Sequence, residues 1–477
     1  MKKVLSFVLI FFCIFVLSGC NNKIDNNNIT KPELKDIPEF NTSDKINVDF
    51  WHARGQTSYD PIQQIINEFN IYYPNIQVTQ TSMGDFTTLR EIVISSIESD
   101  KLPTIVQTSA SDTALYLTYD IVQELESYVQ SNNSILLVND SEQIVGLKEQ
   151  ELNNYIDGFM EECRSFDSFG TLYSLPFTKS TEVLFYNKTI FDKYGYSVPQ
   201  TWDDILAICE DYVTRPEYQN LVKQGKNTAV FSIDSQANLF ITLTQQWGGE
   251  YTKFDASGKG VYAFDNSQSK AAMVFFKENF DKGYFASATH FGADYSSEPF
   301  KAQQCIMTIG SSAGASYNVP YDKSFEVGVT TYPQKDMNNP QVVQQGTNVS
   351  LFKCTNPQEE LAGWLFMKFL TNYESSLEIA TETAYMPIRK DVINSKEYLD
   401  HISGIYTDQN GNIHQYQNIV QKSQMITITQ SSWLHSYPSF DGMSNGRDAA
   451  SSIVSSILYG GKTVKEAYQD AMDSLYS

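Results

Sequence analysis

The polar residues between positions 178 and 182 are the part of this sequence best suited to hold a small molecule. Apolar residues stand on both sides of Thr178-Lys179-Ser180-Thr181-Glu182 in the run LYSLPFTKSTEVLFYN, which covers residues 172–187. The second apolar run, Val183 to Tyr186, predicts a strand. Pro176 has no backbone N–H, so we expect strand pairing to break before the polar insert. Hydroxyl groups and amides are then free to face a bound solute.

The HExxH signature of a zinc protease is absent from the sequence. The stretch Gly460-Gly461-Lys462-Thr463 resembles the end of a phosphate-binding loop, but Ser456 occupies the position of the required first glycine. We therefore expect a turn before a C-terminal helix and no enzymatic activity. Acidic residues are abundant enough to supply a pair of glycosidase carboxylates, so an extracellular carbohydrate-active enzyme stays an alternative.

Cysteine spacing predicts neither a metal site nor a cofactor. Of the six cysteines, two lie in the first twenty residues, and the others are Cys163, Cys209, Cys305 and Cys354. No CxxC or Cys/His spacing occurs among them. Cys209 and Cys305 lie in apolar runs, so we expect them to be small buried hydrophobic residues.

The first twenty residues resemble a bacterial lipoprotein signal. Lys2 and Lys3 precede an apolar run from Val4 to Val16, and Leu17-Ser18-Gly19-Cys20 follows. The apolar run is shorter than the roughly 20 residues of a spanning helix. On this resemblance residues 1–19 are removed, and Cys20 carries a lipid that anchors the protein on the extracytoplasmic face of the membrane. The alternative is a plain signal peptide that is cut elsewhere.

Residues 20–44 are predicted to form a flexible tether, because they are rich in Asn, Asp, Lys and Pro and contain few large apolar groups. The rest of the chain has room for two or three lobes, and no second apolar run approaches membrane-spanning length. The formal net charge is −22. Such an acidic body lacks the basic surface that nucleic acid requires. It also repels anionic lipids, so the tether is the expected link to the membrane.

Alternating strands and helices follow the tether. We predict strands at residues 46–50, 76–79 and 104–107, and helices that begin at Asp60-Pro61 and near Asp85. In an open α/β sheet, ligands lie beyond the carboxyl ends of the strands. This rule selects the turns at residues 51–56, 84–86 and 109–111, all on one rim of the sheet. Further on, Thr201 begins a capped helix, and a short buried strand at residues 305–309 leads into Gly310.

Several motifs then carry a resemblance to a known family. "LPFTKSTEVLFYNKTIFDKYG" with "VPQTWDDILAICEDY" is similar to the hinge and second-lobe segment of extracellular solute-binding proteins that serve ABC importers of maltose, other sugars and glycerol 3-phosphate. "INVDFWHA", "IINEFNIYYPNIQV", "QWGGEY", "FKAQQCIMTIGSS" and "AYMPIRKDV" match in the family's order. Together the matches span the chain from Ile46 to its C-terminus.

The resemblance implies an α/β, two-lobed type II fold of periplasmic binding proteins, in which each lobe is a mixed sheet flanked by helices. Residues 45–178 and 344–388 would form the first lobe, and residues 179–343 and 389–477 the second. Hinge strands near residues 178–181 and 343–346 would join them. A ligand that contacts both lobes selects the closed state.

A solute site in such a cleft needs many groups, because each hydrogen bond contributes roughly 1 kcal/mol net and micromolar affinity corresponds to about 8 kcal/mol. Aromatic faces cover the carbon framework of a sugar. The candidate ligand-binding residues are Trp51, His52, Arg54, Gln56, Phe86, Ser109, Ser111, Thr181, Glu182, Trp247, Ser311, Ser312, Gly346, Thr347, Trp433 and Tyr437.

Some of these residues have an alternative interpretation. Each tryptophan can instead belong to the core. For Trp364, the helical stripe of apolar residues around it predicts this. Trp433 and Tyr437 stand in the polar segment SSWLHSYPSFDG, which indicates an exposed loop. His52 can be a hydrogen-bonded turn histidine, and Arg447 a surface residue at a helix N-terminus.

A neutral sugar or oligosaccharide is the expected ligand. Where the resemblance implies a tyrosine, an acid and an arginine for glycerol 3-phosphate, this sequence has Phe86, Ala110 and Ser439. Glycerol 3-phosphate or a related polyol phosphate stays the alternative. The expected partner is an ABC permease, the expected state is a monomer, and a sensory subunit of the same fold is a rival role.

Overall fold

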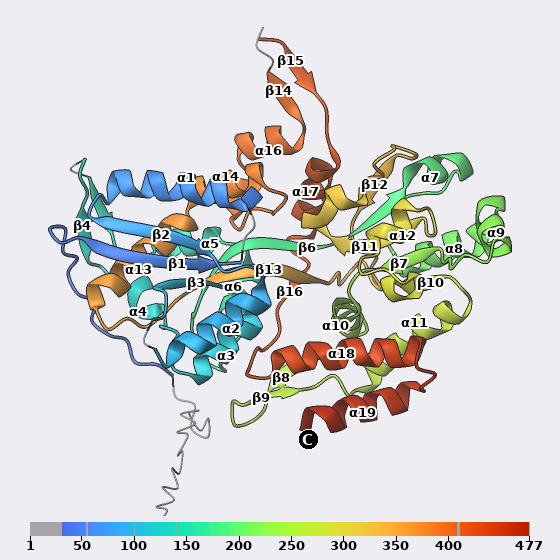
Figure 1. The fold of residues 1–477 in the computed structure, drawn as a ribbon, viewed down its shortest axis with the longest axis horizontal. Coiled ribbons are helices and arrows are strands. Elements are labelled where there is room, and N and C mark those ends of the chain that lie inside the picture. Colours follow the sequence, from blue (N-terminus) through green and yellow to red (C-terminus); the bar gives the residue numbers. More distant parts are fainter. Residues whose placement is uncertain (1–30, 54–55, 100, 140, 408–410, 477) are drawn as a thin grey trace, which may run out of the picture.

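The computed structural model describes residues 31–53, 56–99, 101–139, 141–407 and 411–476. Two α/β lobes lie side by side, and strands β6 and β13 run from one to the other through the middle of the molecule (Figure 1). This two-lobed architecture confirms the predicted fold class.

The first lobe combines a sheet with helices on both of its faces. Ile46, Val48 and Phe50 alternate with exposed residues along its first strand and are buried, as the period-two pattern predicts. Its elements are β1 (Ile46–His52), α1 (Gln56–Tyr72), β2 (Ile76–Ser82), α2 (Phe86–Ile97), β3 (Ile105–Thr108), α3 (Ala110–Thr118), α4 (Glu126–Val129), β4 (Ser134–Leu136), β5 (Glu142–Ile144), α5 (Glu149–Asn154), α6 (Asp157–Cys163), α13 (Pro357–Leu370), α14 (Tyr373–Glu382), α15 (Lys390–Ile393) and α16 (Lys396–Ile402).

The second lobe is built in the same way, around the distal half of β6 (Leu175–Asn187) and the proximal end of β13 (Val342–Leu351). Its other elements are α7 (Lys188–Tyr194), α8 (Trp202–Tyr212), α9 (Pro216–Lys223), β7 (Phe231–Ile233), α10 (Gln236–Gln246), β8 (Thr252–Phe254), β9 (Gly260–Tyr262), α11 (Ser267–Asp281), β10 (Phe285–Ser287), η1 (Ala288–Phe291), α12 (Ser297–Lys301), β11 (Met307–Ser311), η2 (Ser312–Asn318), β12 (Val327–Thr330), α17 (Ile419–Gln430), β16 (Leu434–His435), α18 (Met443–Leu458) and α19 (Val464–Tyr476).

The pairing between β6 and β13 is interrupted at the boundary between the lobes. Gly346 lies opposite Lys179 and Asn348 lies opposite Pro176, with a bulge between the two pairs. Gly346 has φ +100°, and a Cβ there would lie 2.1 Å from the carbonyl oxygen of Thr178. Only glycine fits this close approach. The irregularity falls where Pro176 predicted a break in strand pairing.

The directions of the strands bring two sheet rims to this boundary. β3 is antiparallel to β13, with Thr108 opposite Asn348, so the carboxyl ends of β3 and of its parallel neighbour β1 point toward the hinge. β11 is antiparallel to β6, with Ser311 opposite Glu182, so its carboxyl end points toward the hinge from the other side. The rule for open α/β sheets therefore places a ligand between the two rims.

One boundary between the lobes differs from the predicted one. Val392, Tyr398 and Ile402 form one buried cluster with Ala380 of α14, so α15 and α16 pack on the first lobe although residues 389–402 were assigned to the second. The crossing to the second lobe follows α16, where β14 (Ile405–Thr407) and β15 (Ile413–Gln415) form a projecting hairpin (Figure 1).

The described part of the predicted tether lies against the first lobe. The amide of Lys35 donates to Ser127 Oγ at 3.0 Å, and the amide of Asn41 donates to Gln358 Oε1 at 2.8 Å. Residues 31–44 therefore form a fixed segment rather than a free linker. Residues 1–30, with the predicted signal and Cys20, lie outside the described residues. Among the helices that are described, none is both long and apolar enough to cross a membrane.

Candidate functional site

The first-lobe rim is formed by the starts of helices α2 and α3. Asp85 caps α2 by accepting from the amide of Thr88 at 2.8 Å, and Phe86, the first residue of α2, is exposed. Ser109 caps α3, and its hydroxyl lies 2.9 Å from Ser111 Oγ and donates to Asp112 Oδ2 at 2.7 Å. Caps of this kind hold short polar side chains at a helix start, where they can meet a solute.

The floor between the rims consists of hinge-strand side chains. Ser311 Oγ at the end of β11 lies 3.3 Å from Ser180 Oγ on β6. Thr181 donates its backbone N–H to Ser312 Oγ at 3.2 Å and its hydroxyl to the carbonyl of Val343 at 3.0 Å. The predicted residues Thr181, Ser311 and Ser312 therefore lie together, at the junction of the second-lobe rim with the hinge.

A cavity of about 540 Å³ opens at the carboxyl ends of β7 and β11. Tyr295 and Tyr317 line it with rings that are 62% and 70% exposed. Asp234 is half-buried at its base and accepts from the amide of Ser296 at 2.8 Å. Burial raises the pKa of this carboxyl group. The lining residues are Asp234, Tyr295, Ser296, Ser297, Glu298, Lys301, Gly310, Ser311, Gly314, Tyr317 and Asn318.

A second cavity of about 500 Å³ adjoins the first, because Tyr317 lines both. Its walls come from both lobes: residues 381–385 form the end of α14 and the segment after it in the first lobe, while Ala313, Asn418, Val420 and Gln421 belong to the second. The exposed ring of Tyr317 therefore stands in a space that a movement of the lobes would enlarge or close.

A chain of polar side chains runs beneath the second-lobe rim. Glu182 is 2% exposed, and its Oε1 accepts from Asn238 Nδ2 at 3.1 Å. Asn238 Oδ1 in turn accepts from Arg447 Nη2 at 2.6 Å. Glu182 Oε2 has no hydrogen-bond partner among the described residues. The pKa of Glu182 is raised to about 8, mainly by burial and also by Asp234, although Asn238 and Arg447 act to lower it.

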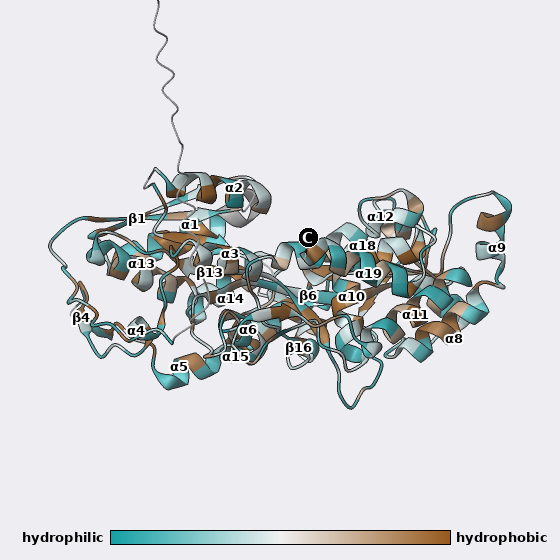
Figure 2. Ribbon diagram, turned by 90° about the horizontal axis from the view of Figure 1, so that it is seen from below, coloured by the Kyte–Doolittle hydropathy of each residue, from teal (hydrophilic) through white to brown (hydrophobic). Residues whose placement is uncertain are grey.

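Arg447 lies in the first turns of α18, and this end of the helix faces the first lobe. Asp448, its neighbour, is close enough to act electrostatically on Arg90 of α2. Tyr437 has both Arg447 and the first-lobe residue Glu162 as charged neighbours. Seen from below, α2 of the first lobe and α12 and α18 of the second stand on either side of β6 (Figure 2).

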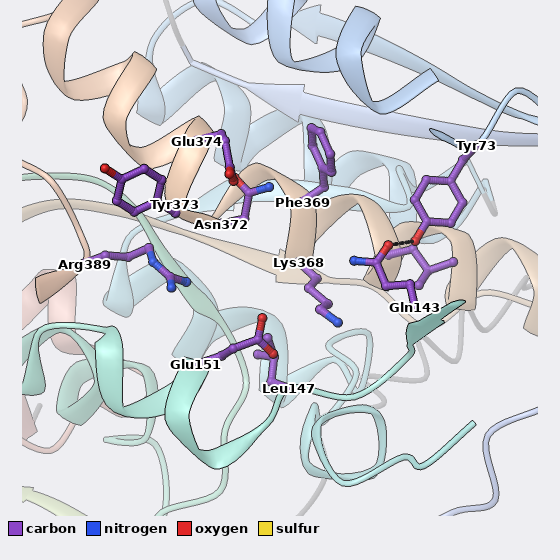
Figure 3. A pocket seen from close by; sticks show the side chains of 11 residues that line it. Tyr73, Gln143, Leu147, Glu151, Lys368, Phe369, Asn372, Tyr373, Glu374 and Arg389 are labelled. Carbon is purple, nitrogen blue, oxygen red and sulfur yellow. Dashed lines mark hydrogen bonds between the residues drawn. The ribbon is translucent and has the colours of Figure 1, made fainter. Parts of the chain in front are cut away.

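A smaller cavity of about 220 Å³ lies within the first lobe (Figure 3). It stands near the amino end of β2, where Tyr73 donates to Gln143 Oε1 at 2.7 Å. Its cations are engaged within the protein: Lys368 donates to the carbonyls of Ile144 and Gly146, and Arg389 donates to Asp391. No lining residue comes from the hinge strands or the second lobe, so lobe closure cannot enclose a solute there.

The sequence matches the family described as "Bacterial extracellular solute-binding protein" over residues 64–402. This match covers well over half of the chain. The chain belongs to this family. Members bind solutes and do not transform them, and the chain is accordingly an extracellular solute-binding protein of the ABC transporter type.

Curated relatives and solved structures agree with this assignment. The sn-glycerol-3-phosphate-binding periplasmic protein UgpB of Escherichia coli (strain K12) is 22% identical over 355 residues, which cover 72% of this chain and 74% of that protein. UgpB from Mycobacterium tuberculosis in complex with glycerophosphocholine has a TM-score of 0.66 at 17% identity and covers 90% of this chain and 97% of its own.

Sugar-binding proteins share the fold to the same degree. The substrate-binding protein Lmo0181 of Listeria monocytogenes in complex with cycloalternan has a TM-score of 0.67 at 15% identity, with 91% of this chain and 98% of that chain covered. The sugar-binding protein MalE of Xanthomonas citri has a TM-score of 0.68 at 15% identity, with 90% and 96% covered. At these identities the likeness shows the two-lobed fold alone.

Several predicted site residues lie away from the cavities. His52 is buried, and its Nε2 lies 3.2 Å from Gln80 Oε1, which is the geometry of the alternative interpretation. Trp247 ends α10 and packs at a tilted angle against Phe275, with 5.1 Å between the ring centroids. Trp51 packs against the first-lobe core and Trp433 against the main core, both half-buried.

The remaining predicted residues are distributed around the hinge. Thr347 is buried and accepts from Gln107 Nε2 at 2.7 Å, so it connects strands within the first lobe. Gly346 shapes the hinge through its backbone. Tyr437 is half-buried against Tyr251 rather than in an exposed loop. Arg54 lies outside the described residues, and of Gln56 only its place at the start of α1 is described.

Residues that the sequence interpretation missed include Tyr295, Tyr317, Asp234 and Asn238. Nothing in their neighbourhood distinguishes them in the sequence, since they reach the rim only because β11 pairs with β6 and β7 pairs with β11. Arg447, interpreted as a possible surface residue, is instead half-buried and hydrogen-bonded to Asn238. Cys209 and Cys305 are buried and Trp364 belongs to the core, as predicted. Within the described ranges, no three side chains form a cluster able to hold a metal ion.

Proposed function

We propose that this protein captures a neutral oligosaccharide between its lobes. The observation that carries the proposal is the pair of exposed tyrosines, Tyr295 and Tyr317, beside a polar cavity at the strand ends of the second lobe. Flat aromatic faces cover the apolar faces of sugar rings. Serine hydroxyls and carboxylates such as Asp234 exchange hydrogen bonds with sugar hydroxyls.

The charges of the cavity favour a neutral solute over a phosphate ester. Asp234 and Glu298 line it, against the single cation Lys301. A phosphate bound there would meet two carboxyl groups and one ammonium group, which is an unfavourable balance. Sugar hydroxyls meet no such penalty, because a carboxylate accepts their hydrogen bonds.

The size of the space also favours an oligosaccharide. The two cavities that meet at Tyr317 measure about 540 and about 500 Å³. Each lies within the range of roughly 300 to 1,000 Å³ of sites for ligands of drug size. A molecule as small as glycerol 3-phosphate would fill only part of this space.

Arg447 supports one second candidate, a phosphate-bearing polyol. Its guanidinium lies at the face between the lobes and keeps donors beyond the one that contacts Asn238. Guanidinium groups suit phosphate recognition, and the curated relatives at 22% identity are named as glycerol 3-phosphate-binding proteins.

The proposed setting is the outer face of the cell membrane. The motif Leu17-Ser18-Gly19-Cys20 supports cleavage before Cys20 and a lipid anchor on that residue. The loaded protein would deliver its solute, as a monomer, to an ABC permease. Replacement of Cys20 by serine should release the protein into the medium, and retention of the Cys20→Ser protein on the cell would refute the anchor.

A thermal-shift screen of the chain from residue 20 onward tests the ligand class. A ligand at 100 times its dissociation constant stabilises the folded protein by about 2.7 kcal/mol. The library should contain neutral oligosaccharides, monosaccharides, glycerol 3-phosphate and glycerophosphodiesters. Stabilisation by an oligosaccharide is the expected result. Stabilisation by phosphate esters alone would favour the second candidate, and turnover of any sugar would revive the enzyme alternative.

A further inference from the structure

Glu182, Asn238 and Arg447 connect the hinge strand to the face between the lobes. Glu182 lies on β6, Asn238 in the first turn of α10 and Arg447 near the start of α18. The amide of Asn238 uses both of its ends: Nδ2 donates to Glu182 Oε1 at 3.1 Å, and Oδ1 accepts from Arg447 Nη2 at 2.6 Å. The carboxyl group of Glu182 therefore fixes the orientation of this amide. The amide in turn fixes the position of the Arg447 guanidinium.

The surroundings of Glu182 favour a neutral carboxyl group. It is 2% exposed, and its Oε2 has no partner in the described part of the chain. The charged or titratable groups around it are Asp234, which precedes α10, Tyr332, which follows β12, and Arg447 on α18. From α17, Gln430 contacts only the backbone carbonyl of Glu182, at 2.9 Å. Burial outweighs the attraction of Arg447, so the pKa of this carboxyl is raised to about 8.

Arg447 would respond to a negative charge on Glu182, because it has no carboxylate partner of its own among the described residues. Its guanidinium donates to the neutral amide of Asn238, and the phenols of Tyr437 and Tyr251 are further polar neighbours. A guanidinium has five N–H donors, so the contact with Asn238 leaves others for a solute. A negative charge on Glu182 would attract the guanidinium into the second lobe.

We propose that Glu182 is a positioning residue for Arg447 and acts through Asn238. While the Glu182 carboxyl is neutral, Arg447 presents its donors to the solute between the lobes. Loss of the proton to solvent leaves a carboxylate that draws Arg447 inward and weakens solute binding. The inference rests on the proposed function only in placing a solute between the lobes, and it holds for either ligand class.

A measurement without ligand tests the coupling itself. The Nε–Hε signals of the arginines can be followed by NMR as the pH rises, and an Arg447→Lys variant assigns the signal of Arg447. We expect that signal to move with a midpoint near pH 8, the value expected for Glu182. The movement should vanish in Glu182→Gln and also in Asn238→Ala, which leaves the carboxyl in place. A signal that does not titrate, or that titrates equally in both variants, overturns the proposal.

The affinity for the solute, measured as a function of pH, tests whether loss of the Glu182 proton weakens binding. With a solute found in the screen, calorimetry should show affinity falling about tenfold, or about 1.4 kcal/mol, between about pH 6.5 and about pH 9.5. Glu182→Gln should bind with a flat pH profile, and the same slope in this variant overturns the proposal. If the Arg447 signal titrates as expected but no carbohydrate binds, the positioning role stands and the proposed ligand class fails.

Discussion

Gly346 on β13 and Thr178 on β6 approach so closely that a Cβ on the glycine would lie 2.1 Å from the carbonyl oxygen of Thr178. The contact lies where each hinge strand passes from one lobe to the other, opposite Lys179. Backbone atoms cannot yield as a side chain can, so the hinge depends on the absence of a side chain here.

Gly346→Ala should therefore destabilise the protein. The φ of +100° disfavours alanine, and the clash must be relieved by separating the hinge strands. We expect a loss of roughly 2 to 4 kcal/mol in the free energy of unfolding, measured by urea denaturation. Gly314→Ala is the matched control, because its Cβ would lie 3.7 Å from Tyr317, an ordinary contact. Equal stability of the two variants would contradict this view of the hinge.

Tyr317→Ala and Tyr295→Ala should weaken carbohydrate binding without lowering stability. Both rings are mostly exposed, so their loss removes little packing, but it removes a flat surface for a sugar ring. We expect each change to reduce affinity by about 1 to 2 kcal/mol, as measured by calorimetry. Tyr321→Ala is the control, because Tyr321 is fully exposed and lines neither cavity at Tyr317. Affinity lost equally in all three variants would argue against a platform.

Trp247→Ala should act on stability rather than on binding. The ring packs at a tilted angle against Phe275, with 5.1 Å between the centroids, and the ammonium of Lys335 lies 5.1 Å from the centroid of Trp247. We expect a cost of roughly 2 to 4 kcal/mol in unfolding free energy and an unchanged dissociation constant. A large loss of affinity in a stable Trp247→Ala protein would restore this residue to the site.

Glu182→Gln should change the pH dependence of stability. The folded protein holds the Glu182 proton more tightly than the unfolded chain does, because burial raises the pKa from 4.5 to about 8. The stability due to this proton is present below about pH 4.5 and is lost as the pH rises through about 8. At 1.36 kcal/mol per unit, the loss is on the order of 5 kcal/mol.

Melting curves of the wild type and of Glu182→Gln at several pH values test this sign. The melting temperature of the wild type should fall progressively relative to that of the variant between about pH 5 and about pH 8.5. Comparing the two proteins cancels the contribution of acids that do not act on Glu182, such as Glu378, whose pKa is also raised. A difference that stays constant with pH would show that Glu182 titrates normally.

The sequence was sufficient to predict those features that depend on local pattern. The alternation of Ile46, Val48 and Phe50 predicted β1, and Pro176 predicted the interruption of the hinge pairing. Helix α1 begins at Gln56, four residues before the predicted start at Asp60, and Pro61 lies inside it. A proline near the first turn removes few helix hydrogen bonds, so it does not fix the start.

The site itself was only partly predictable. Ser311 and Thr181 were predicted as site candidates because each ends or begins an apolar run. Tyr317 and Asn238 were not, because their positions depend on which strands pair across more than a hundred residues. Trp247 and His52 were predicted as site residues because their types are common in sugar sites. In the structure Trp247 packs against Phe275, and His52 lies within hydrogen-bonding distance of Gln80.

Isothermal titration of the chain from residue 20 onward, with neutral oligosaccharides and with glycerol 3-phosphate, tests the central claim most directly. Our account predicts saturable binding of at least one oligosaccharide, with one site per protein and loss of that binding in a Tyr295→Ala/Tyr317→Ala protein. It predicts no heat of binding with glycerol 3-phosphate. Tight binding of glycerol 3-phosphate with no response to any oligosaccharide would contradict the account.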